Sequence, residues 1–446
     1  MKKQKRRTKF NLFLILIIIL ITIYIAITLS YSKGNIYKGE IHQIPESSIE
    51  FLYDLTYEDN QGNIIHEQEI FDKIFEIIDN AENFIILDMF LFKESEKQVY
   101  RNLANETTEH LINKKNKNPD IPIYLITDYI NNINHNNQNL KKLKEQGIII
   151  IYSAPHKIKD FDKETPLNYF LKANRKRLNH RKLIIADNQD KIVSLITSAN
   201  PHDESSAHSN VAFYIKEKIW KDIYDFEKKE NKLSNNQFNK FFNNLSESQE
   251  GNISIQFLAD NALVSSIEKE IENTQKGESI DIMMFYLSYD KIIDKLIQAS
   301  ERGVNIRIIL DQSIDAFGKK KNGMPNKPVA EILNKKSKGN IQIRWYKTHG
   351  EQFHIKTTIF NKQDNQSIIF LGGSHLVNYD TINYNSQSDV KLIADSKTEI
   401  IQKINTLFNR IWFNKQGTYT TDYEEFRDTS AIKQIVHRAR ALFRLP

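Results

Sequence analysis

Two short segments of this 446-residue chain combine residue types that could carry out chemistry at phosphorus. His180 and Lys182 stand two residues apart at the start of an apolar stretch, and His354 and Lys356 begin a second one in the same way. Residues i and i+2 of a strand project to one face, so each pair would present an imidazole and an ammonium together. Breaking a phosphodiester requires a nucleophile, a proton donor and positive charge around the phosphoryl oxygens. Two such pairs could supply all three.

A turn of small residues follows each pair, after a second apolar stretch. Ser198 lies 18 residues after the first histidine and is followed by Asn200, whereas Ser374 lies 20 residues after the second histidine. A single His-x-Lys sequence is common and usually marks an exposed strand end. Two copies with the same kind of downstream turn indicate a functional arrangement.

These motifs resemble those of the phospholipase D superfamily, whose members carry two His-x-Lys motifs with a downstream Gly-Ser-x-Asn. The resemblance covers about residues 45–415. It implies one active site where two halves meet across a pseudo-twofold axis, with one histidine forming a phosphohistidine and the other protonating the leaving alcohol. It also implies that neither a metal nor another cofactor is required. The phosphoryl oxygens would be held by the two lysines together with Ser198, Asn200 and Ser374.

The same resemblance implies that an acidic residue downstream of each motif supports the catalytic histidine. Asp389 lies 35 residues after His354, but the equivalent stretch 30 residues after His180 has Asn210. A carboxylate favours the imidazolium, whereas an amide oxygen can fix a tautomer without adding negative charge. We therefore expect His354 to be the general acid and His180 the nucleophile. The alternative is that Asp389 and Asn210 are simply polar residues at sheet ends.

The second motif departs from the family pattern at one position. Leu376 occupies the place of its asparagine, so one phosphate donor is missing unless His375 or Asn378 replaces it. This departure leaves a non-catalytic module that binds the cell envelope as an alternative to an enzyme.

The elements that must position these residues occur twice in the same order. The predicted apolar strands are 84–92, 121–128 and 148–152 in the first half and 279–287, 304–311 and 340–346 in the second. Strands that alternate with helical patterns predict an α/β fold, here two similar halves with parallel or mixed sheets. The halves are placed at 45–216 and 253–415, joined by a helix-containing connector at 217–252.

The N-terminal segment has the properties of a membrane anchor. Residues 10–31 carry no charge and are rich in Leu and Ile, which is enough to span a hydrocarbon core of ~30 Å. The stretch is longer than the apolar region of a cleaved signal peptide, about 7–15 residues. Basic residues gather in 1–9, which predicts a cytoplasmic N-terminus and a catalytic region outside the cell membrane.

Composition narrows the class of partner. The chain has no cysteine, which excludes disulfides and thiol nucleophiles. Six of its 62 basic residues precede residue 10, so the remainder carries 56 basic and 56 acidic residues. A nonspecific nucleic-acid binder usually has a basic excess in its binding domain. We therefore expect a phospholipid substrate, hydrolysed or transferred in a reaction that includes the cardiolipin-synthase type, with a surface nuclease as the runner-up.

Two further segments could contact a phospholipid or the membrane. An insertion before the first motif ends in a basic cluster, which suits an anionic head group or a nucleic-acid phosphate and consists of Lys172, Arg175, Lys176, Arg177 and Arg181. The C-terminal tail, 416–446, contains a basic amphipathic helix. Its apolar face comprises Ile435, Val436, Ala439, Leu442 and Phe443. This helix could lie on a membrane surface or dock onto the rest of the chain.

Overall fold

A computed structural model describes residues 36–95, 99–132, 137–153, 178–189, 191–231, 233, 250–316, 319–377 and 385–443. The predicted anchor at 10–31 and the insertion residues 154–177 lie outside this part of the chain. Among the described residues, no helix is both long enough and apolar enough to cross a membrane.

The first half contains an eight-stranded sheet and the helices that cover it. Its elements are η1 (Glu46–Ser48), β2 (Ile49–Glu58), β3 (Ile64–Glu67), α2 (Ile70–Asn80), β4 (Ile85–Met89), α3 (Leu103–Lys117), β5 (Ile123–Asp128), α4 (Tyr129–Asn132), α5 (Gln138–Glu145), β6 (Ile149–Ser153), β7 (Leu178–Asn179), β8 (Lys182–Asn188), β9 (Lys191–Thr197), η3 (Asp203–Ser205) and β10 (Asn210–Ile215). The sheet order is β3-β2-β10-β9-β8-β4-β5-β6. Helix α7 (Ile219–Asn231) follows.

The second half contains a nine-stranded sheet. Its elements are β11 (Ile253–Asp260), α9 (Ala262–Asn273), β12 (Ser279–Met284), α10 (Asp290–Glu301), β13 (Asn305–Asp311), β14 (Asp315–Ala316), β15 (Lys319–Lys320), α11 (Asn326–Lys336), β16 (Ile341–Tyr346), β17 (Lys356–Asn361), β18 (Gln366–Gly372), β19 (Asn385–Ser386), β20 (Ser388–Asp395) and α12 (Glu399–Trp412). Together with β1 (Ile36–Ile44) and β21 (Thr420–Asp422), the order is β1-β11-β20-β18-β17-β12-β13-β16-β21. The chain continues through η5 (Tyr423–Phe426) to α13 (Ala431–Phe443).

The two sheets share one strand order. Without the outer strands β3, β1 and β21, the order β2-β10-β9-β8-β4-β5-β6 corresponds one for one to β11-β20-β18-β17-β12-β13-β16. In both sheets the last three of these strands are parallel and the others antiparallel. The predicted α/β fold with mixed sheets is confirmed, and the matching order agrees with the predicted duplication.

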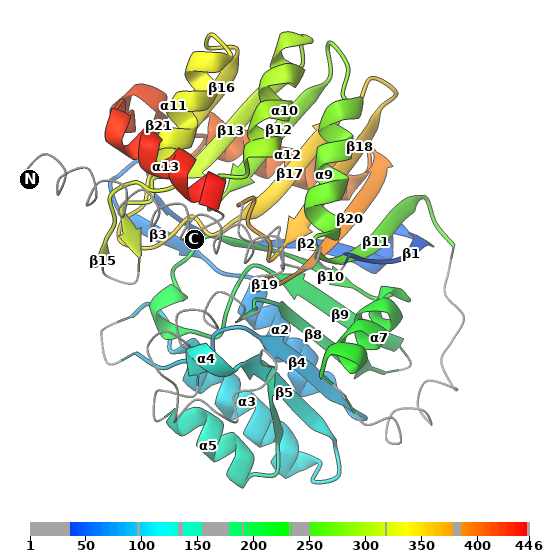
Figure 1. Cartoon of the computed structure of the whole chain (residues 1–446). Helices are drawn as coiled ribbons and strands as arrows, with labels where there is room; N and C mark the ends of the chain where they lie inside the picture. Colours follow the sequence, from blue (N-terminus) through cyan, green and yellow to red (C-terminus); the bar gives the residue numbers. More distant parts are fainter. Residues whose placement is uncertain are drawn as a thin grey trace, which may run out of the picture.

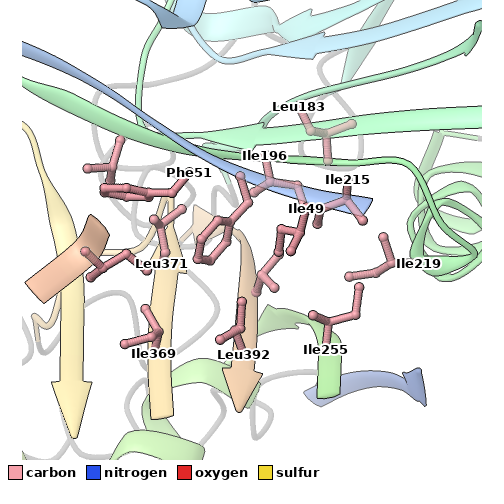
Figure 2. Close-up of a cluster of buried hydrophobic side chains, with 14 of the residues drawn as sticks. Ile49, Phe51, Leu183, Ile196, Ile215, Ile219, Ile255, Ile369, Leu371 and Leu392 are labelled. Atoms are coloured by element: carbon pink, nitrogen blue, oxygen red, sulfur yellow. The ribbon is translucent and has the colours of Figure 1, made fainter. Parts of the chain in front are cut away.

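The sheets lie face to face, with helices on their outer faces (Figure 1). Helices α2, α3 and α5 cover the first sheet, and α9, α10 and α11 cover the second. The inner faces form a single hydrophobic core to which both halves contribute. Figure 2 shows Phe51 and Ile196 of the first half in one cluster with Leu371 and Leu392 of the second. The two halves therefore bury apolar surface against each other, which holds them in one arrangement.

The apolar runs in the sequence follow from burial on both faces. In β8, Leu183 and Ile185 face the shared inner core while Ile184 and Ala186 face the helices. Strands covered on both sides read as continuous apolar stretches rather than as alternating ones. This is why the strand after each His-Lys pair could be found from the sequence.

The predicted domain limits need three adjustments. Strand β1 lies before residue 45 but pairs with β11 of the second sheet, and β21 extends that sheet beyond residue 415. Helix α7, inside the predicted connector, contributes Ile219 and Ile223 to the shared core. Long-range pairing of this kind has no local signature in the sequence.

Candidate active site

Both His-Lys pairs are buried at the starts of equivalent strands. Lys182 is the first residue of β8 and pairs with Met89, and Lys356 is the first residue of β17 and pairs with Met284. Each lysine Nζ donates a hydrogen bond to the carbonyl of the histidine two residues earlier, at 2.7 and 2.8 Å. The lysines are 0% and 2% exposed. Two ammonium groups are therefore held in the interior, where their charge is weakly screened.

An aromatic residue lies beside each pair. Phe90 follows β4, and its ring lies 4.6 Å from the ring of His180 and 4.9 Å from the Nζ of Lys182. Phe285 follows β12, and its ring lies 5.1 Å from the ring of His354 and 5.6 Å from the Nζ of Lys356. The aromatic faces add a favourable interaction with each buried cation.

Short stretches of backbone pair between the two halves in front of each His-Lys pair. In front of the first motif, β7 pairs with β19 of the second half, and the His180 N–H donates to Ser386 O at 2.9 Å. In front of the second motif, Ser209 of the first half bridges to Phe353, and the Ser209 N–H donates to Gln352 O at 3.1 Å. Each motif is therefore positioned by the opposite half, as expected for one composite site.

The hydrogen-bond partners of the histidines differ from the expected ones. His180 Nδ1 lies 2.9 Å from Gln387 Oε1, and His354 Nδ1 lies 3.1 Å from Asn210 Oδ1. Asn210 thus supports the histidine of the other half, not the one that precedes it in sequence. Asp389 instead accepts hydrogen bonds from the backbone N–H and the hydroxyl of Ser374. The expectation that Asp389 contacts His354 was wrong, since both histidines are held by amides.

Amide partners and burial keep both imidazoles neutral. A bond to an amide oxygen places the proton on Nδ1 and leaves the lone pair on Nε2. Burial, followed by the charge of Lys182 and Lys356, holds the pKa of His180 well below 6.5. Burial, with Lys356 as the next contribution, does the same to the pKa of His354. At neutral pH both imidazoles are therefore uncharged.

The buried carboxyl of Asp389 has a different environment. Burial raises its pKa to about 7, against the opposing effects of Ser374 and both site lysines. The carboxyl group of Asp389 therefore titrates near neutral pH. Its described hydrogen bonds are with Ser374 and not with either histidine. Its hydrogen bonds with Ser374 make it a support for the turn after β18.

We expect Gln387→Glu to raise the pKa of His180. The new carboxylate would replace an amide oxygen that lies 2.9 Å from Nδ1, and an adjacent negative charge favours the imidazolium. Less neutral imidazole would remain at low pH, so the acid limb of the pH–rate profile should move to higher pH. NMR titration of His180 measures the change, with Gln43→Glu on exposed β1 as the control. An unchanged pKa would contradict the cross-half contact.

Two aspartates that the motif pattern did not single out fix the backbone in front of the histidines. Asp128 Oδ2 accepts from the Asn179 N–H at 3.0 Å, and Asp311 Oδ2 accepts from the Phe353 N–H at 2.9 Å. Burial raises the pKa of Asp311 to about 7. The sequence contains a signal for both, because each ends the same strand of its half.

Two asparagines hold the loops that carry the aromatic rings. Asn132 Nδ2 donates to Phe90 O at 2.8 Å, and Asn326 Nδ2 donates to Phe285 O at 2.6 Å. The Oδ1 of Asn132 accepts from the Phe92 N–H, and the Oδ1 of Asn326 accepts from the Leu287 N–H. Each of these donors lies two residues after the aromatic residue. These residues were missed because no pattern in the sequence aligns them.

The two motif serines support their own turns rather than the site itself. Ser198 Oγ donates to Asn210 Oδ1 at 3.0 Å, and Ser374 Oγ donates to Asp389. Their hydroxyl protons are thus used within their own halves. Asn200 lies beside the Phe90 loop, where its Oδ1 accepts from the Leu91 N–H at 3.3 Å. The serine hydroxyls therefore stabilise the turns that follow β9 and β18.

Arg181 does not belong to a head-group cluster, contrary to expectation. It is buried, and its Nε lies 2.9 Å from Asp88 and 2.8 Å from Glu227. The other members, Lys172, Arg175, Lys176 and Arg177, lie outside the described residues. In the part of the chain that the structure describes, no group of three or more His, Asp or Glu side chains is placed to hold a metal ion.

The part of the chain that carries the second motif is similar to a known family. Residues 267–412 match the family model described as the phospholipase D-like domain of cardiolipin synthase. This segment contains His354, Lys356, Ser374 and Asp389. Over these residues the chain is similar to the phospholipase D superfamily. At the level of the family, this supports a phosphodiesterase or phosphatidyltransferase.

Solved structures agree with this fold. Phosphatidylserine synthase from Haemophilus influenzae Rd KW20 matches with a TM-score of 0.61 and 14% identity, covering 91% of this chain and 95% of that one. Polyphosphate kinase from Porphyromonas gingivalis matches at 0.46 and 12% identity, over 81% of this chain and 50% of that one. The phospholipase D family member Nuc from Salmonella typhimurium matches at 0.29 and 16% identity, over 37% and 97%. Only the first carries weight for the fold. No curated protein matches the sequence.

Proposed function

We propose that this protein is a phospholipase D-type enzyme that cleaves or exchanges the phosphodiester of membrane phospholipids through a phosphohistidine. The observation that carries the proposal is the pair of buried neutral imidazoles, each beside a buried ammonium, in one site assembled by both halves. Neutral Nε2 atoms and preorganised positive charge are what in-line displacement at phosphorus requires.

The reaction proceeds in two displacements. In the first, Nε2 of one histidine attacks phosphorus, the P–O bond to the head-group alcohol breaks, and the second histidine gives that oxygen a proton. The negative charge of the bound phosphoryl group favours the protonated form of this second imidazole, offsetting the effect of burial. In the second displacement, water or an alcohol loses its proton to that histidine and attacks phosphorus, releasing the first histidine.

Three observations favour a lipid as the substrate. The predicted anchor would keep the site near a bilayer, and the chain after residue 9 has no excess of positive charge. On α13, the side chains of Ile432 and Ile435 are 74% and 65% exposed, so the described chain does not cover these two apolar residues. Exposed apolar residues on a basic amphipathic helix suit a membrane surface.

The proposal includes a single-pass location with the catalytic region outside the cell membrane. It rests on the basic residues before the apolar segment 10–31. Protease added to intact protoplasts should remove the region after residue 33 and leave a short N-terminal stub. Protection of the whole chain would reverse the proposed orientation.

The enzyme is expected to convert phosphatidylglycerol to phosphatidic acid, or to a new phospholipid when an acceptor alcohol is added. Mass spectrometry of vesicles incubated with the full-length protein measures both products, and a protein with both His180→Ala and His354→Ala is the matched control. A parallel incubation with DNA in chelator separates the alternatives. Cleavage of DNA but not of lipid would make the protein a nuclease, and cleavage of neither would indicate a non-catalytic module.

A further inference from the structure

The register of the second motif places His375, and not Leu376, opposite the first motif's asparagine. The residue after each motif lysine pairs across the hairpin with an equivalent partner. These pairs are Leu183 with Ile196 and Thr357 with Leu371. Four residues beyond those partners stand Asn200 and His375. The hairpin formed by β17 and β18 is one residue longer than the hairpin formed by β8 and β9. Counting residues from each motif serine instead placed Leu376, and not His375, opposite Asn200.

Backbone contacts support the same equivalence. Pro201, the residue after Asn200, accepts a hydrogen bond at its carbonyl from the Lys93 N–H. Leu376, the residue after His375, accepts the equivalent hydrogen bond in the second half from the Ser288 N–H. The Leu376 side chain is buried among the residues that face the helices of the second half. Leucine at this position therefore leaves no missing donor in the site, because the donor's place belongs to its neighbour.

His375 lies between the two catalytic histidines. Its ring centroid is 5.3 Å from that of His180 and 6.0 Å from that of His354. Phe285 and Tyr286 contact its other sides, at 5.5 and 5.4 Å. The residue is 5% exposed, and its Nδ1 has no hydrogen-bond partner among the described residues. A buried polar atom without a partner is costly, so this position is expected to be occupied by a ligand during function.

We propose that His375 is a third imidazole of the active site, which donates a hydrogen bond to a non-bridging oxygen of the bound phosphoryl group at the place that Asn200 takes in the first half. This inference rests on the proposed function, since it assumes that a phosphoryl group binds between the histidines. An amide at that place would bind the oxygen without titrating. An imidazole there couples phosphate binding to proton uptake.

The groups around His375 make the sign of this coupling clear. His180, Lys182 and Lys356 face it from the two motifs, and Lys321, whose Nζ donates to the Tyr286 hydroxyl, faces it from the β15 side. Burial and then these positive or neutral groups hold the pKa of His375 well below 6.5. A bound anion opposes that effect and favours the imidazolium. Protonation on binding therefore strengthens phosphate binding at low pH.

Calorimetric titration of the full chain with inorganic phosphate tests the proposal without lipid turnover. His375→Ala should weaken binding by about 10- to 100-fold, as expected when one hydrogen bond to a charged ligand is lost. His375→Asn should retain most of the affinity near pH 8. The ratio of its Kd to that of the unchanged protein should grow as pH falls toward 5.5, because ionisation of phosphate and of the other histidines cancels in the ratio.

His202→Asn provides the matched control, since His202 is equally buried but lies on the loop that contacts Lys93. Its affinity for phosphate should follow that of the unchanged protein at every pH. Circular dichroism identifies any variant that fails to fold, in which case the asparagine variant carries the test. Equal phosphate affinity in the alanine variant, or a pH-independent ratio, would overturn the role of His375 alone. Absence of phosphate binding by the unchanged protein would overturn the proposed function as well.

Discussion

His180→Ala and His354→Ala are each expected to lower turnover of a phosphodiester by at least about 10³-fold. One variant would lose the only atom that attacks phosphorus, and the other would lose the group that protonates the leaving alcohol. Both rings are buried, and an amide of the opposite half holds each of them in place. Steady-state kcat with a phospholipid measures the loss, and His110→Ala, on the surface of α3, is the control.

A trapping experiment with the same variants assigns the two roles. With a nitrophenyl diester the leaving group needs no proton, so the variant that lacks the acid should still form a phosphohistidine. The variant that lacks the nucleophile should form none. Acid quench followed by mass spectrometry identifies the modified residue. Both histidines have amide partners, so their contacts do not distinguish the nucleophile from the acid as Asp389 was expected to do. The trapping experiment makes this distinction. Full activity in either variant would contradict a shared site.

Lys182→Met and Lys356→Met are each expected to lower kcat by about 10²- to 10³-fold. Methionine retains much of the buried volume but removes a charge that the protein holds beside the reacting phosphoryl group, where water does not screen it. The loss should fall on kcat more than on KM, because charge at the phosphoryl oxygens grows in the transition state. Single-turnover measurements with the nitrophenyl diester check this directly.

Lys336→Met on α11 is the control for these lysine variants, because Lys336 is more than half exposed. The two motif lysines come from different halves, so their variants also test whether the halves share one site. A large loss for one substitution and none for the other would show that the second pair does not take part in the reaction.

Local sequence was sufficient to find the two His-Lys pairs and the strands that follow them. Imidazole and ammonium chemistry is a property of the residue type, and spacing of two along a strand places both side chains on one face. The strands ending at Asp128 and Asp311 were found because burial on both faces makes them continuous apolar runs. Repetition of this order indicated two similar halves.

Tertiary structure decided which groups support which histidine. Gln387 reaches His180 and Asn210 reaches His354 only because β7 pairs with β19 and Ser209 with Phe353, contacts that join distant parts of the chain. No local pattern records such a pairing, so a comparison along the sequence assigned Asn210 to the wrong histidine and gave Asp389 a contact that it does not make.

The place of His375 shows the same limit at the scale of one residue. Counting along the chain put Leu376 opposite Asn200, whereas hydrogen-bonded register puts His375 there. Register is set by which backbone groups pair across a hairpin, and a loop that is one residue longer changes the count without changing the pairing. The sequence by itself therefore determined the residue types of the candidate site and their two copies. The folded backbone determined the partners of each imidazole, because those partners are set by pairing between strands.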